Sequence, residues 1–141
     1  MFATAGLYWR RAMCSGMDDI ELGIPSGIVD SLPADSEDTK RDMEQAVGGW
    51  ERELNAALGS EEPASAVVDH IERFEQRWEA YDEYVVELRA WGQSPIYAMA
   101  WRDLQAAVIA QIYDHEDVAS HLDRERNARL VEDGIRLQNT E

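Results

Sequence analysis

Histidines and carboxylates are the residues of this sequence best suited to bind a metal ion. The three histidines are His70, His115 and His121, and His115 lies within the acidic run 114–117. Side chains on one helix face are three or four residues apart, whereas His115 and His121 are six apart. The Glu-x-x-His motif of di-metal helical bundles is absent. We therefore predict no metal and no cofactor, and keep a metal-binding helical-bundle enzyme built on these three histidines as an alternative.

Motifs for covalent catalysis and phosphate binding are also missing. The chain contains neither Gly-x-Ser-x-Gly nor Gly-x-Gly-x-x-Gly, and no glycine-rich phosphate loop opens a helix. Cys14 is the only cysteine, which excludes a disulfide or a thiolate cluster within one chain, and we interpret it as a small buried apolar residue. Carboxylates are too frequent for one pair to be singled out. We predict no catalytic residue and interpret the protein as not an enzyme.

Aromatic residues give the stronger functional signal, because aromatic and arginine side chains are the usual anchors of protein interfaces. The chain has five tryptophans and five tyrosines. Trp78 belongs to a regular heptad repeat and is interpreted as core. The predicted partner-contact residues lie outside this repeat or in the N-terminal stretch: Phe2, Tyr8, Trp9, Arg10, Arg11, Tyr84 and Trp91.

Nucleic acid is not expected as a direct partner. Binding phosphates requires clustered lysines and arginines, but the chain carries 29 acidic residues and a formal net charge of −16. Arg124, Arg126 and Arg129 alternate with carboxylates, and Glu125 stands four residues before Arg129, in the favourable order for an ion pair. We interpret this group as a solvated, self-paired helix face.

Membrane insertion and secretion are not expected either. No apolar run approaches the roughly 18 residues of a membrane span. At the N-terminus Arg10 and Arg11 follow the apolar stretch instead of preceding it, which is the wrong order for a signal peptide.

The balance of charges resembles that of proteins from salt-in halophiles, the haloarchaea above all. One lysine accompanies twelve arginines, and 45% of the residues are apolar. A charge of −16 over 141 residues opposes a compact state by self-repulsion. At about 1 M salt the Debye length falls to about 3 Å and the penalty largely vanishes. We predict a salt-requiring protein of a high-salt cytoplasm, or of a virion assembled there.

Hydrophobic spacing predicts an all-α fold with a long helix at about 61–91, begun by Ser60 and Pro63 and ended by Gly92. Its large apolar residues alternate at spacings of four and three, the pattern of a heptad seam. We call this set the heptad seam: Val67, Ile71, Phe74, Trp78, Tyr81, Val85 and Leu88.

Two further helices flank this one. A helix at about 36–58, capped by Asp35 or Ser36, contains Gly48-Gly49, which indicates a close approach of another helix or a kink. A third helix begins at Pro95 and carries an apolar stripe that starts at Tyr97. It continues to about 137, or it breaks at residues 114–117 and leaves a fourth helix.

The first 35 residues differ from the rest. Residues 2–14 fit a short helix, and residues 15–35 are broken by glycines and prolines although they hold many apolar side chains. We predict an N-terminal arm at 1–35 and a bundle domain of three to four helices at 36–141. The arm either folds back on the helices of 36–137 or docks on another subunit, and we favour docking. The long heptad-patterned hairpin lies within that domain.

The sequence favours a non-enzymatic structural or assembly protein of a halophilic source, acting as a subunit or adaptor in a larger complex. A connector-type virion component of a haloarchaeal tailed virus is one form of this role. The partner is a protein, and the chain is expected to be a homo-oligomer or a subunit of a larger assembly. A homodimeric regulatory binding protein is kept as an alternative beside the metal-binding enzyme.

Overall fold

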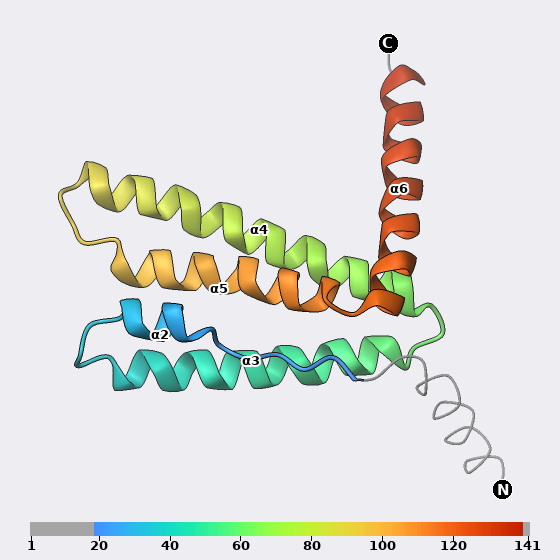
Figure 1. The fold of residues 1–141 in the computed structure, drawn as a ribbon. Coiled ribbons are helices and arrows are strands. Elements are labelled where there is room, and N and C mark those ends of the chain that lie inside the picture. Colours follow the sequence, from blue (N-terminus) through green and yellow to red (C-terminus); the bar gives the residue numbers. More distant parts are fainter. Residues whose placement is uncertain (1–18, 140–141) are drawn as a thin grey trace, which may run out of the picture.

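The computed structural model describes residues 19–139 and is all-α over that range, as predicted (Figure 1). The short helix predicted at residues 2–14 lies outside the described residues. The predicted helices at 36–58 and 61–91 are confirmed, and the third helix takes the broken alternative. The helices are α2 (Ser26–Ser31), α3 (Glu37–Leu58), α4 (Pro63–Ala90), α5 (Ile96–Tyr113) and α6 (Glu116–Asn139).

Helices α4 and α5 form an antiparallel hairpin that is the centre of the molecule (Figure 1). α3 packs on α4, and the contact reaches from the turn that joins the two helices to the edge-to-face ring pair of Trp50 and Phe74. α2 packs on α5 near the α4–α5 turn. α6 leaves the hairpin at a steep angle and contacts the first half of α4. The two halves of α4 therefore have different neighbours, and this decides which parts of the heptad seam are covered.

The heptad seam is buried at Val67, Ile71, Phe74 and Val85, but not at Trp78. Trp78 is 36% exposed and borders a hollow of about 290 Å³ that is lined by residues of α4 and α5 alone. The prediction that Trp78 is a core residue is therefore wrong. The small side chain of Ala106 faces this hollow from α5, and it leaves the indole ring only partly covered.

The caps of the helices differ in part from those predicted. Pro63 stands in the first turn of α4 as expected, but the Ser60 hydroxyl donates to the carbonyl of Ala57 at 2.7 Å and so belongs to the end of α3. Ser36 is the N-cap residue of α3, yet its hydroxyl makes no cap hydrogen bond and instead contacts the hydroxyl of Tyr97 at 3.0 Å.

Residues 19–35 pack on the helices. The side chains of Ile20, Ile28 and Leu32 belong to the same buried cluster as the apolar faces of α3, α4 and α5. The side-chain amide of Asn55 pairs with the backbone of Ile20, accepting from its N–H at 2.8 Å and donating to its carbonyl at 3.0 Å. Gln111 holds Gly23 in the same way, with two bonds of 2.9 Å. The prediction that the arm docks on another subunit is therefore wrong for residues 19–35.

Gly48 and Gly49 of α3 have room around them. A Cβ atom at Gly48 would lie 3.6 Å from Nη1 of Arg52, and one at Gly49 would lie 3.9 Å from Nη2 of the same side chain. These are ordinary van der Waals distances, and Arg52 belongs to α3 itself. Within the described residues no other helix approaches the glycines closely, so the predicted close approach of another helix is wrong for the isolated chain.

Arginines of α6 attach this helix to α4. Arg129 contacts Glu125 on its own helix at 3.2 Å, as predicted, but it also contacts Asp69 and Glu72 of α4, each at 3.0 Å. Arg126 contacts Glu75 of α4 at 3.1 Å. Among the described side chains of α6, the predicted self-pairing holds for Glu125 and Arg129, whereas the ion pairs of Arg126 and Arg129 with Asp69, Glu72 and Glu75 join two helices.

Candidate interaction surface

The turn between α4 and α5 has a defined geometry. Gly92 has a φ of +71°, in the left-handed region that favours glycine. Its N–H donates to the carbonyl of Arg89 at 3.1 Å, and the N–H of Gln93 donates to the carbonyl of Leu88 at 2.8 Å. These two bonds form a Schellman motif. The predicted stop at Gly92 is confirmed, and the motif fixes the backbone of Trp91, the C-cap residue.

Large apolar side chains are exposed on both sides of this turn. Trp91 is 80% exposed and Tyr84 is 51% exposed. Together with the half-buried Leu88 they stand at spacings of four and three, so they share one face of α4. From α5, Ile96 and Tyr97 are exposed as well. We call these four residues, Tyr84, Trp91, Ile96 and Tyr97, the aromatic end surface.

A shallow groove of about 260 Å³ runs through this surface between α4 and α5. The rings of Tyr81 and Trp101 stack in its lining, with centroids 6.4 Å apart and planes inclined by 15°. The hydroxyl of Tyr97 is held at 3.0 Å by Ser36, at the start of α3. Contacts from three helices therefore fix the lining in place, while Tyr84 and Trp91 remain open to solvent.

The three histidines do not form a common site. His70 lies half-buried on α4, where burial lowers its pKa, with the nearby Arg73 lowering it further. His115 precedes α6, and its Nε2 lies 3.1 Å from the carbonyl oxygen of Asp19. His121 is exposed on α6, with Nδ1 at 3.3 Å from Nη2 of Arg124. In the part of the chain that the structure describes, no group of three or more histidine, cysteine or carboxylate side chains could hold a metal ion.

The predicted contact residues divide into two groups. Phe2, Tyr8, Trp9, Arg10 and Arg11 lie outside the described residues, and their role stays a prediction. Tyr84 and Trp91 are both exposed and lie at one end of the helical hairpin.

Ile96 and Tyr97 were not predicted as contact residues, because the apolar stripe of the third helix begins at Tyr97. Their position directly after Pro95, beside the turn that joins α4 to α5, was the signal that could have separated them from the core.

A family comparison covers most of the chain. The model of a family of unknown function, DUF7971, matches residues 17–139. The chain belongs to this family. The match includes all of the described helices and therefore the whole aromatic end surface. No curated protein and no solved structure gives a match.

No helix in residues 19–139 combines the length and the apolar character needed to cross a membrane.

Proposed function

We propose that the protein is a non-enzymatic assembly subunit that associates with further copies of itself through the aromatic end surface. The observation that carries the proposal is the exposure of Trp91 beside Tyr84 on a rigid turn. Burying a tryptophan that is 80% exposed contributes about 4 kcal/mol of apolar transfer free energy. Association costs at least about 4 kcal/mol in lost translational and rotational freedom, so one residue is not enough. The aromatic end surface contributes four exposed apolar residues to the contact.

The geometry supports a contact between copies. A two-fold axis places the same patch of each copy against the other, so that Trp91 of one copy can lie along the groove of its neighbour. The fixed backbone of the Schellman motif and the fixed groove lining reduce the entropy lost on binding. Aromatic side chains are enriched at the centres of such contacts.

Salt is part of the proposal. Two copies that each carry a net charge of −16 repel one another at low ionic strength. Screening at about 1 M salt removes most of this repulsion and leaves the apolar contact. A high-salt cytoplasm is the setting in which this surface would assemble, and a connector-type subunit of a haloarchaeal tailed-virus particle is a more specific form of the same proposal.

Light scattering in molar KCl tests the proposal. A single chain has a mass of 16.0 kDa. A ring-forming assembly subunit gives a mass many times larger, and a homodimeric regulatory protein gives twice this mass. A mass of one chain at all accessible concentrations and salt levels would contradict self-association.

A further inference from the structure

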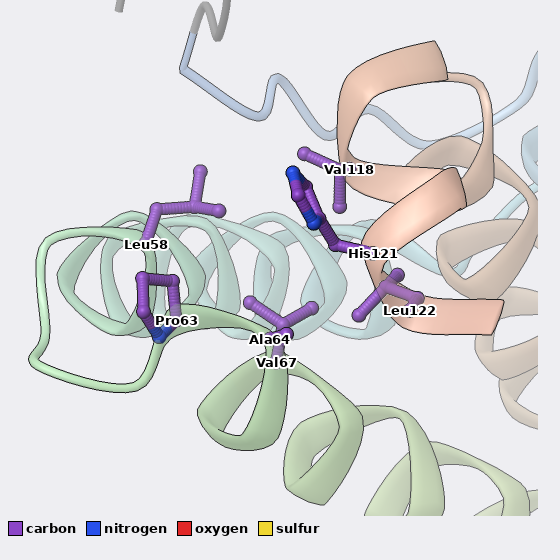
Figure 2. Close-up of a pocket in the computed structure, with 7 residues that line it drawn as sticks. All are labelled: Leu58, Pro63, Ala64, Val67, Val118, His121 and Leu122. Carbon is purple, nitrogen blue, oxygen red and sulfur yellow. The ribbon is translucent and has the colours of Figure 1, made fainter. Parts of the chain in front are cut away.

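An apolar pocket of about 210 Å³ lies where the end of α3, the start of α4 and the start of α6 meet (Figure 2). Side chains from all three helices border the same space. The lining residues are Leu58, Pro63, Ala64, Val67, Val118, His121 and Leu122. Apart from the ring of His121, the lining is aliphatic, so the pocket suits an apolar side chain better than a polar ligand.

The chain enters the described structure beside this pocket. The carbonyl of Asp19 is held by His115, three residues before the pocket residue Val118. Ile20 is held by Asn55, three residues before the pocket residue Leu58. Three residues of helix rise by roughly 5 Å. Both attachments of residues 19 and 20 therefore lie about one helical turn from the pocket lining.

The sequence before Asp18 and Asp19 has an unusual composition for this chain. Residues 1–17, which we call the N-terminal segment, contain no Asp or Glu, although the whole chain carries 29. They include Arg10 and Arg11 and large apolar residues such as Phe2 and Trp9. Glu61 and Glu62, both exposed, come immediately before the pocket residue Pro63. The apolar residues of the segment thus suit the aliphatic lining, and Arg10 and Arg11 are opposite in charge to Glu61 and Glu62.

We propose that this pocket is the docking site of an apolar side chain from the N-terminal segment of the same chain. A segment that belongs to the same chain as its docking site has an effective concentration on the order of 1 mM, so at about 10 µM protein the chain's own segment outcompetes that of a second copy by about 100-fold. The proposal is independent of self-association through the aromatic end surface, which lies at the other end of the α4–α5 hairpin. It also differs from the contact with another molecule that the sequence predicts for Trp9 and its neighbours.

Cys14 provides a direct test, because it is the only cysteine and belongs to the N-terminal segment. The substitution His121→Cys places a second thiol in the pocket lining. Mild oxidation of the full-length variant at about 10 µM should give a disulfide within one chain, in excess of cross-linked dimers by about 100-fold. Non-reducing electrophoresis separates the two products, and a peptide map identifies the link between Cys14 and the thiol introduced at position 121.

The matched control is Gln93→Cys, which places an exposed thiol at the opposite end of the hairpin. The proposal requires much slower cross-linking at this position. Equal rates at both positions, or no link to position 121, would overturn it. Cross-linked dimers at position 121 would show that the occupant comes from a second copy, which also overturns docking within the chain.

A second variant tests the pocket without cysteine chemistry. Ala64→Phe fills part of the pocket and should expel the segment, so that trypsin cleaves after Arg10 and Arg11 several-fold faster than in the wild type. Circular dichroism shows whether the variant is folded. An unchanged cleavage rate in a folded variant would contradict docking, and neither this result nor the cross-linking result depends on the mass measured by light scattering.

Discussion

Replacing Gly48 and Gly49 of α3 by alanine is expected to stabilise the fold. Alanine is favoured over glycine by about 1 kcal/mol at each helix-interior position. The new Cβ atoms would lie 3.6 and 3.9 Å from the guanidinium of Arg52, which is ordinary contact with a flexible side chain. The backbone of Gly48 and Gly49 accepts alanine without strain, since Gly92 is the only described glycine with a positive φ. The double variant should therefore gain about 2 kcal/mol.

Thermal and denaturant unfolding followed by circular dichroism in molar KCl measure this gain. For a domain of about 150 residues, each kcal/mol shifts Tm by roughly 2–4 °C, so the double variant should melt roughly 4–8 °C higher. The matched control is Ala56→Gly, an exposed position of the same helix, which should lose about 1 kcal/mol.

The outcome also separates two roles for the glycines. Destabilisation of the double variant would refute the reasoning, because it would show that the fold needs glycine at one of these positions. A stabilised chain that no longer assembles would show that another molecule approaches the α3 backbone at Gly48 and Gly49. The contact between copies would then lie on α3 and not at the aromatic end surface.

Three further predictions follow from single features of the structure. Gln105 is 1% exposed, and its side-chain oxygen has no hydrogen-bond partner among residues 19–139. Gln105→Met should therefore raise the free energy of unfolding by about 1 kcal/mol in a denaturant titration. A lower free energy of unfolding would show that the amide oxygen has a partner in the folded protein. Burial lowers the pKa of His70 from its ordinary value of 6.5, so just below pH 6.5 the unfolded chain binds more protons than the folded chain. The wild type should therefore lose stability relative to His70→Gln as the pH falls through this window. Parallel pH profiles of the two proteins would contradict this. Raising KCl from about 0.1 M to about 1 M shortens the Debye length from about 10 to about 3 Å and should raise Tm, whereas a salt-independent Tm and helical signal would refute the halophilic interpretation.

Local patterns predicted the elements that depend on local interactions. The four-three spacing gave the extent of α4, and Gly92 marked its end because a left-handed residue closes the helix there. The acidic run around His115 correctly suggested a break, which the structure places between Tyr113 and Glu116.

Contacts between residues that are far apart along the chain could not be predicted from the sequence. Asn55 and Gln111 hold the backbone of residues 20 and 23 across separations of 35 and 88 positions, and a polar residue on a helix does not reveal such a partner. The exposure of Trp78 could not be predicted either, because it depends on which α5 residue faces the indole ring, the small Ala106, and not on the heptad pattern of α4. The same limit applies to the aromatic end surface: periodicity places Tyr97 on a stripe, but only the fold shows that the stripe emerges from the core at that point.

Light scattering of a surface variant tests the central claim most directly. The variant carries Tyr84→Ser and Trp91→Ser, and the control carries Val86→Ser, a 63% exposed apolar residue of the same helix outside the aromatic end surface. In molar KCl we expect the wild type and the control to have the same mass, a multiple of 16.0 kDa, and the double variant to have the mass of a single chain with an unchanged circular dichroism spectrum. An unchanged oligomer mass in the double variant, or a single-chain mass in the wild type, would contradict assembly through this surface.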